Sequence, residues 1–368
     1  MGIEAGAVEG VGMSAGPNPE FWRGKRVLVT GHTGFKGGWL TMWLNSMGAE
    51  THGFALSPPT EPSLFRVVNV ADGMTSSTIG DIRDAALVKD AFARSRPEVV
   101  FHLAAQPLVR SSYERPVETF EVNVMGVVHL LEAVRATLGI KALVNVTTDK
   151  CYENKEWLWG YREHEPLGGS DPYSSSKACA ELVTAAYRRS FLAGTGVSVS
   201  TARAGNVIGG GDWATDRLLP DVFRALDANA RLSIRSPEAT RPWQHVLEPA
   251  SGYLMLAERL YEEGGAFAEA WNFGPADGDE RTVRWIVEHL VSRRAGIAWD
   301  FDTGPHPHEM RSLKLDSSKA RSRLDWRPRW PLATALSKTG EWHDAWKAGH
   351  DMRALTLVQI GEYARYAA

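Results

Sequence analysis

Short runs of apolar, often β-branched residues alternate along the first 205 residues with longer segments whose apolar positions recur at helical spacing. The short runs predict buried strands at residues 26–30, 51–56, 99–103, 142–146 and 197–203. The longer segments predict helices at residues 39–47, 83–93, 122–138 and 173–191. Strands that alternate with helices are typical of an α/β fold, in which helices cover both faces of a doubly wound parallel sheet.

The pattern changes after Gly205, where glycine and proline interrupt the apolar periodicity. We interpret this as the start of a smaller, mostly C-terminal α/β lobe that binds substrate. The expected division gives residues 21–205 and about 240–275 to the sheet domain, and about 206–239 and 276–368 to the smaller lobe. A cleft between two lobes is the usual place for a small-molecule site.

Composition narrows the classes of function. The chain carries 41 basic and 44 acidic side chains, so its net charge of −3 does not favour nucleic acid as a partner. Its two cysteines are too few for a disulfide framework, and no apolar stretch is long enough to span a membrane. Residues 1–20 lack Lys and Arg, so they do not look like a signal peptide and are expected to be a flexible tail. A cytoplasmic protein without a membrane partner is expected.

Three glycines, Gly31, Gly34 and Gly37, lie between the first predicted strand and the first predicted helix. Glycine there lets the backbone approach a pyrophosphate, while the helix N-terminus offers free N–H groups. The pattern predicts a dinucleotide site in a Rossmann-type sheet, with a purely structural turn as the alternative. The second strand does not end in an acidic residue that could hold the ribose of NAD, so NAD and NADP both stay open. Asp81 is either an acceptor for the adenine amine or a helix N-cap.

Tyr173 and Lys177 have the spacing Y-x-x-x-K, which places both on one face of a helix. A phenol titrates near pH 10, so it is a poor base at neutral pH. A neighbouring ammonium group and a nicotinamide cation are expected to lower that pKa, so that the phenolate can take a hydroxyl proton while hydride leaves the carbon. The alternative is an amphipathic helix with two unrelated polar residues.

Four motifs occur in order: G-x-x-G-x-x-G at residues 31–37, H-L-A-A-Q at 102–106, T-T-D-K at 147–150 and Y-x-x-x-K at 173–177. With them the chain resembles the extended short-chain dehydrogenase/reductases over nearly its whole length after residue 21. Within that group it looks like the nucleotide-sugar 4,6-dehydratases, and most like those that act on CDP-glucose. The last point rests on Lys150, because the enzymes that act on dTDP-glucose usually carry Glu at that position.

The resemblance implies a reaction on CDP-glucose that uses bound NAD and yields the 4-keto-6-deoxy sugar. Tyr173 would take the C4 hydroxyl proton, Thr148 would share that hydrogen bond, and Lys177 would hold the nicotinamide ribose. Lys150 would remove the C5 proton while Asp149 protonates the departing C6 hydroxyl. These roles require a lowered pKa for Lys150 and a raised pKa for Asp149. Relatives supply deoxysugars to surface polysaccharides such as O-antigen.

The resemblance also implies two sets of binding residues. Those for NAD are Gly31, Thr33, Gly34, Phe35, Gly37, Asp81, Ile82, Leu103, Ala104, Ala105, Gln106, Tyr173 and Lys177. Those for the nucleotide sugar are Asn206, Arg217, Arg241, His308 and Glu309. No metal site is expected, because His306 and His308 have no companions at ligand spacing. A homodimer or higher oligomer is expected, in which the helices at 122–138 and 173–191 pair with those of a second copy.

Three alternatives stay open. The same chemistry could act on another nucleotide hexose, such as a dTDP- or GDP-sugar, since no residue that recognises cytosine is evident. A nucleotide-sugar epimerase would not need the pair Asp149 and Lys150. A non-enzymatic NAD(P)-sensing protein of this fold would often lack Tyr173 or Lys177, which are both present. The arginines at 321, 323, 327 and 329 are expected on a solvated face.

Overall fold

The computed structural model describes residues 16–292, 298–302, 304 and 313–366. Seven parallel strands form one sheet in the order β11-β6-β5-β4-β1-β2-β3. Their bounds are β1 Arg26–Thr30, β2 Glu50–Ala55, β3 Ser76–Ile79, β4 Val99–His102, β5 Ala142–Val146, β6 Ser198–Ala204 and β11 Ala270–Phe273. The expected parallel sheet is therefore confirmed, and the five strands predicted from apolar runs are each found within one residue.

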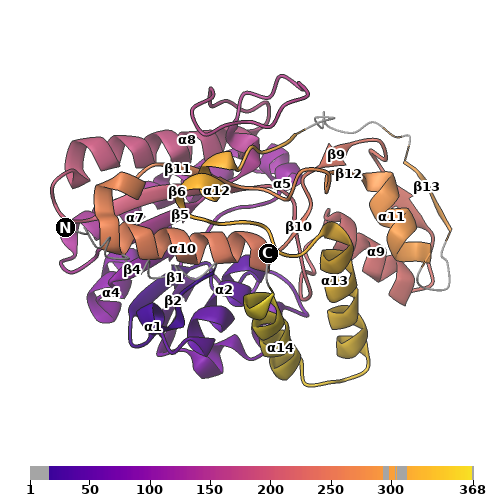
Figure 1. Ribbon diagram of the computed structural model, residues 1–368, viewed down its shortest axis with the longest axis horizontal. Helices are drawn as coiled ribbons and strands as arrows, with labels where there is room; N and C mark the ends of the chain where they lie inside the picture. The colour runs from indigo at the N-terminus through magenta and orange to yellow at the C-terminus, as the bar shows by residue number, and fades with distance from the viewer. Residues whose placement is uncertain (1–15, 293–297, 303, 305–312, 367–368) are drawn as a thin grey trace, which may run out of the picture.

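Helices lie on both sides of this sheet, with α8 and α10 on opposite faces in Figure 1. The main ones are α2 Phe35–Ser46, α4 Ala85–Ser95, α7 Gly126–Ala136, α8 Pro172–Tyr187, α10 Leu247–Glu263 and α14 Met352–Arg365. Shorter ones are α1 Pro19–Trp22, α3 Leu64–Val67, α5 Val109–Glu114, α6 Pro116–Phe120 and α12 Ser318–Arg323, with 3₁₀ turns η1 Val70–Gly73, η3 Asp149–Cys151 and η5 Gly264–Phe267. Two π-helical segments, η2 Glu121–Met125 and η4 Arg188–Leu192, continue into α7 and follow α8.

Strand β1 shows how its sequence produces this layering. Successive side chains of a strand point to opposite faces. Val27 and Val29 therefore pack in the cluster that contains residues of α2 and α10, whereas Leu28 packs in the cluster that contains residues of α4 and α7. The strand order reverses between β1 and β4, which is the point where a ligand crevice opens at the carboxyl ends of such sheets.

A third apolar cluster lies outside the sheet and joins α9 Leu218–Asp227, α11 Val283–Ser292 and α13 Leu332–Lys347. Three two-stranded pairs accompany these helices: β7 Val207–Ile208 with β10 Gln244–His245, β9 Thr240–Arg241 with β12 Arg281–Thr282, and β8 Leu232–Ile234 with β13 Trp299–Phe301. Helices α9, α11 and α13 lie near one another on one side of Figure 1, and all three fall in the segments expected to form the smaller lobe. Where one lobe ends and the other begins stays a prediction.

Helix α10 binds both ends of the described chain. The Glu258 carboxylate accepts hydrogen bonds from the Asn18 amide at 2.9 Å and the Trp22 indole at 2.6 Å. At the other end of the helix, the Glu248 carboxylate accepts from the Trp330 amide at 2.7 Å and the Tyr363 hydroxyl at 2.5 Å. Packing against α10 thus begins within the 20 residues expected to be a tail.

No helix in the described part of the chain is both long and apolar enough to cross a bilayer.

Candidate active site

The glycine-rich turn joins β1 to α2 at the carboxyl edge of the sheet. A Cβ on Gly31 would meet the backbone of Ala104 at 2.7 Å, and a Cβ on Gly37 would collide with the Gly31 carbonyl oxygen. These two glycines are therefore required by the packing of the turn itself. Gly34 is different, since a Cβ there would meet only the Gly31 carbonyl oxygen at 3.4 Å, an ordinary contact. Gly34 is also the N-cap of α2 and provides no side-chain cap, so the first amides of the helix face a surface that an anion can approach.

Two residues of this turn other than its glycines, Thr33 and Phe35, were expected to contact the cofactor. The Thr33 hydroxyl donates to the Leu56 carbonyl at 2.8 Å, which fixes the turn to the end of β2. Phe35 is half-buried at the start of α2. His32, which the sequence did not single out, is buried and bonds through Nε2 to the Ser77 hydroxyl at 2.7 Å. Burial lowers the pKa of His32 to about 4, so this histidine is neutral at physiological pH.

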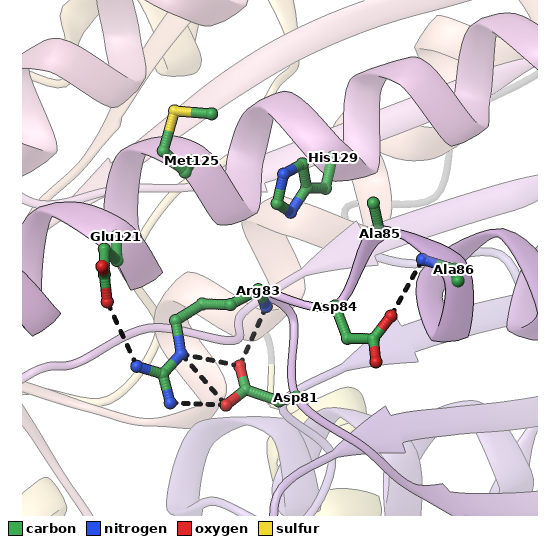
Figure 2. A pocket seen from close by; sticks show the side chains of 8 residues that line it. All are labelled: Asp81, Arg83, Asp84, Ala85, Ala86, Glu121, Met125 and His129. Carbon is green, nitrogen blue, oxygen red and sulfur yellow. Dashed lines mark hydrogen bonds and ion pairs between the residues drawn. The ribbon is translucent and has the colours of Figure 1, made fainter.

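At the end of β3, Asp81 faces Arg83 rather than capping a helix. Figure 2 shows the Arg83 guanidinium between the Asp81 carboxylate, at 2.6 Å, and Glu121, at 3.3 Å. The hydrogen bonds from Arg83 lower the pKa of Asp81. The helix N-cap is Asp84, whose carboxylate accepts from two amides of α4, so the N-cap interpretation of Asp81 is wrong. Asp81 borders an open pocket of about 830 Å³, while Ile82 is buried beside it.

The loop after β4 carries Leu103, Ala104, Ala105 and Gln106, all half-buried. Asn123 of η2 holds this loop in place. Its side-chain oxygen accepts from the Gln106 amide at 2.9 Å, and its side-chain nitrogen donates to the Gln106 carbonyl at 3.1 Å and to the Ser176 hydroxyl of α8 at 2.9 Å. Asn123 thus connects the expected cofactor loop to the helix of the Y-x-x-x-K motif, a role that no sequence motif indicated.

Thr148, Asp149 and Lys150 follow β5, where Thr148 is the N-cap of the turn η3, and Thr148 and Asp149 are buried. The Thr148 hydroxyl donates to Asp149 Oδ1 at 3.0 Å. Asp149 is only 2% exposed, and its Oδ2 has no hydrogen-bond partner within the described chain. Burial raises the pKa of Asp149 against the opposing effects of Lys150, Thr148 and Arg241, which is the direction that a proton donor needs. An unpartnered buried carboxyl oxygen at a sheet edge is suited to a hydroxyl of a ligand.

Helix α8 begins at Pro172 with Asp171 as its N-cap, and it holds Tyr173 and Lys177 one turn apart. Burial raises the pKa of Tyr173 to about 12, while Thr148 and Arg217 act in the opposite direction. The expected lowering by the neighbouring ammonium is therefore not found, because burial of the phenol dominates. Lys177 donates to the Val146 carbonyl at 3.3 Å, and burial lowers its pKa to about 8.

The smaller lobe brings two of the expected substrate arginines to this cluster. Arg217 pairs with Asp212 at 2.9 Å and lies close enough to Tyr173 to lower the pKa of the phenol. Arg241 is buried and lies close enough to Asp149 to oppose the rise in its pKa. Asn206 is half-buried, and its carbonyl accepts from the Gln244 amide at 3.0 Å. The remaining two predictions, His308 and Glu309, lie outside the described residues.

Lys36 belongs to this cluster and was missed from the sequence. It lies inside the glycine-rich turn, and its charge interacts with Arg217, Asp149 and Lys177. Burial lowers the pKa of Lys36 to about 8, with Arg217 adding to the effect. The sequence could have indicated Lys36, because it lies between Gly34 and Gly37 of a turn expected to bind phosphate, where a lysine side chain can pair with the anion.

Within the described part of the chain, no group of three or more His, Cys, Asp or Glu side chains could hold a metal ion.

Comparison with known proteins decides the family. The family model for GDP-mannose 4,6 dehydratase matches residues 28–339, which include both the glycine-rich turn and the segment after β5. The chain belongs to this family.

Individual relatives agree with this membership. The chain is 55% identical over 349 residues to CDP-glucose 4,6-dehydratase of Salmonella typhimurium, covering 93% of this chain and 97% of the relative. It is 29% identical over 267 residues to dTDP-glucose 4,6-dehydratase of Streptomyces antibioticus, covering 72% and 75% of the two chains. A solved dTDP-glucose 4,6-dehydratase of Streptomyces venezuelae with NAD bound has a TM-score of 0.76 at 24% identity, covering 89% of this family member and 99% of that chain. At that identity the structural likeness supports the fold alone.

Proposed function

We propose that this protein is a CDP-glucose 4,6-dehydratase, which converts CDP-glucose to CDP-4-keto-6-deoxyglucose. The observation that carries the proposal is the buried Asp149 beside Lys150, at the sheet edge that also holds Tyr173 and Lys177. The 55% identical relative over nearly the full length supports CDP-glucose as the substrate. Two free cysteines, Cys151 and Cys179, fit a reducing, cytoplasmic location.

NAD is the cofactor that the glycine-rich turn fits. The packing of the turn does not require glycine at position 34, so the missing side chain there leaves room for a ligand. Helix α2 begins at this point with no side-chain cap on its first amides, and such amides can bind a pyrophosphate. When bound, NAD⁺ would supply the hydride acceptor for the oxidation at C4 and a positive charge at the nicotinamide. The residues expected to hold it are those of the turn, the loop after β4 and Lys177, with Asp81 at the adenine end.

Tyr173 is the base of the first step. It takes the proton of the C4 hydroxyl, and Thr148 shares the hydrogen bond to that oxygen. Because burial raises the pKa of Tyr173, the phenolate needs positive charge nearby, and Arg217 supplies part of it. The Lys177 ammonium, which bonds to the Val146 carbonyl, is aimed at the same edge of the sheet and orients the nicotinamide ribose.

Asp149 and Lys150 perform the elimination. The ketone formed at C4 acidifies the C5 proton, which Lys150 removes, while Asp149 protonates the departing C6 hydroxyl. Burial raises the pKa of Asp149, which favours the protonated form that this step needs. After the elimination, the hydride taken from C4 goes to C6 and a proton returns to C5, so the reaction causes no net oxidation of the sugar. An epimerase would have no use for this pair.

Incubation of the purified protein with CDP-, dTDP-, GDP- and UDP-glucose, with NAD⁺ supplied, tests the proposal. Mass spectrometry is expected to detect the loss of one water from CDP-glucose. Loss of water from another nucleotide sugar would retain the chemistry and refute the substrate. If folded protein that binds NAD⁺ removes water from none of them, the dehydratase proposal is wrong.

We also propose that the protein forms a homodimer through α6, η2 and α8. Large apolar side chains are exposed along these elements and along η4, which follows α8: Val117 70%, Phe120 38%, Met125 46%, Leu182 59% and Phe191 46%. Helices α7 and α8 pack side by side, as two helices of a four-helix bundle would. Leu182→Glu is expected to convert the dimer to a monomer in light scattering, whereas Val358→Glu, on the exposed face of α14, is expected to leave the dimer intact.

A further inference from the structure

A buried ion pair lies directly beneath the turn that carries the proposed acid and base. The carboxylate of Glu181, on α8, accepts from Arg203 Nε at 2.9 Å and from Arg203 Nη2 at 2.8 Å. The side chains of Glu181 and Arg203 are each only 3% exposed. Burial of two charges is costly unless their geometry is good and their other polar atoms are satisfied. The remaining partners of this pair are therefore informative.

One partner of Glu181 lies just before residues 148–150, which we call the acid–base turn. Thr147 donates its hydroxyl to Glu181 Oε1 at 2.5 Å, and Thr201 of β6 donates to Oε2 at 2.6 Å. Thr147 directly precedes Thr148, the first residue of the turn. Glu181 also lies one helical turn after Lys177 on α8. One carboxylate therefore holds the beginning of the acid–base turn and the helix that carries Tyr173.

One partner of Arg203 lies just after the acid–base turn in the chain. Arg203 Nη1 donates to the Tyr152 hydroxyl at 2.7 Å, and Tyr152 donates in turn to the Asn272 side chain at 2.7 Å. Tyr152 is fully buried and stands two residues after Lys150. Asn272 continues the chain of bonds to the Tyr161 carbonyl at 2.7 Å. The end of the acid–base turn is therefore fixed to the strands β6 and β11.

We propose that Glu181 and Arg203 are positioning residues that clamp the segment 148–150 from both ends, with Thr147 and Tyr152 as the two attachment points. The inference rests on the proposed function for the chemistry that this clamp serves. Elimination requires Asp149 and Lys150 to reach two adjacent carbons of one sugar at once, and displacement of about 1 Å can cost about a hundredfold in rate. Oxidation at C4 depends on Tyr173 of α8 and on Thr148, whose neighbour Thr147 stays bonded to Glu181 when the Tyr152 hydroxyl is removed.

Tyr152→Phe tests the clamp without exposing an unpaired charge. Loss of either Glu181 or Arg203 would leave its partner buried alone, and such a variant is expected not to fold. In Tyr152→Phe the ion pair is retained, and Arg203 Nη1 keeps the Glu163 carbonyl as an acceptor at 3.1 Å. The matched control is Tyr187→Phe, which removes a hydroxyl bonded to Glu132 at 2.8 Å on the solvent side of α8.

Two measurements are made on both variants and on the unmodified protein. The first compares the two half-reactions, by the near-ultraviolet absorbance of reduced nicotinamide and by the loss of water from CDP-glucose. Tyr152→Phe is expected to lower kcat for water loss about tenfold at unchanged KM while reduced nicotinamide accumulates. The second measurement needs no substrate. Cys151 is fully buried between Lys150 and Tyr152, so its alkylation, followed on its own peptide, reports release of the turn.

Tyr152→Phe is expected to speed alkylation of Cys151 several-fold, with Cys179 on α8 as the internal reference. If water loss and Cys151 alkylation both match those of Tyr187→Phe, the clamp does not exist. If oxidation and water loss fall equally, Tyr152 has a general structural role and the positioning inference is wrong. If the unmodified protein removes water from no nucleotide sugar, only the proposed function is wrong. The clamp is then tested by alkylation alone, and it is wrong if Cys151 reacts at the same rate in Tyr152→Phe as in the unmodified protein.

Discussion

Asp149 and Lys150 are neighbours in the chain but lie in different surroundings. Asp149 is buried, and one of its carboxyl oxygens has no hydrogen-bond partner among the described residues, whereas Lys150 is half-buried. Burial favours the neutral form of an acid, so the raised pKa of Asp149 follows from its position at the end of β5. Adjacent residues can therefore act as acid and base on adjacent carbons of the same sugar.

Asp149→Asn keeps the size of this side chain and removes its proton-donating carboxyl. It is expected to lower kcat for water loss by about a hundredfold or more, the usual contribution of a general acid. Oxidation at C4 is expected to persist, because Tyr173 and Lys177 are untouched. Rapid-mixing absorbance and mass spectrometry of the sugar separate the two steps. Equal loss of both steps would contradict the assigned role of Asp149.

At the scale of the elements, all five strands predicted from apolar runs are present in the structure. Buried strands and amphipathic helices can be predicted because they leave strong local patterns in the sequence. The long helices were predicted as continuous, whereas the structure contains π-helical turns at η2 and η4. The motif residues of the turn, of β5 and of α8 do converge on one edge. The sequence could not show the cross-element partners, because Asn123, Lys36 and the pair Glu181 and Arg203 acquire their roles only through packing.

Arg329 illustrates the same limit. It was expected on a solvated face with its neighbouring arginines, yet it is buried, and its guanidinium donates to the Tyr363 carbonyl at 3.0 Å near the end of α14. The Arg329 amide also donates to Glu248 of α10 at 3.0 Å. Nothing in the local composition distinguishes this arginine from Arg323 or Arg327, which are exposed. Only the docking of α14 onto α10 does so.

Gly34→Ala tests whether the N-terminus of α2 binds the pyrophosphate of the cofactor. The added methyl group makes only an ordinary contact inside the protein, so the free energy of unfolding is expected to change by less than about 0.5 kcal/mol. The methyl group would occupy the surface that the pyrophosphate approaches, so the affinity for NAD⁺ is expected to fall by about tenfold or more, about 1.4 kcal/mol. Titration calorimetry measures this affinity.

Gly265→Ala is the control for that experiment, since a Cβ at Gly265 meets nothing within 4 Å and lies in η5, away from the turn. It is expected to bind NAD⁺ as the unmodified protein does. Unchanged affinity in Gly34→Ala would show that the cofactor does not lie against this part of the turn.

At the scale of the whole molecule, α10 joins parts that are far apart in the sequence. Its residues Glu248 and Glu258 receive hydrogen bonds from the two ends of the described chain, and its apolar face covers β5 and β6. Burial raises the pKa of each of these carboxyls to about 7. The charged form of each is therefore disfavoured in the folded state.

Stability is consequently expected to decrease as the pH rises through neutrality. For Glu258, the stabilisation is fully present below the ordinary pKa of about 4.5 and is lost as the pH rises through about 7. Glu258→Gln removes this titration while its side-chain oxygen still accepts from Asn18 and Trp22. The variant is expected to be more stable than the unmodified protein at pH 8 by about 2 kcal/mol, with a smaller difference at pH 5.

Chemical denaturation at the two pH values measures this difference. Glu288→Gln, at an exposed position of α11, is the control and is expected to show no such dependence. If Glu258→Gln lowers stability at both pH values, the carboxylate is required in its charged form and the prediction is wrong.

The position of α10 also has a consequence for synthesis of the chain on the ribosome. Strands β1 to β6 leave the ribosome first, but the apolar face of β5 and β6 is covered by a helix that ends only at Glu263. A nascent chain that has emerged as far as residue 205 therefore contains most of the sheet and the glycine-rich turn, while the part of β5 and β6 that α10 covers is still bare. We expect such an intermediate to expose apolar surface to chaperones and proteases until α10 has emerged and packed against β5 and β6.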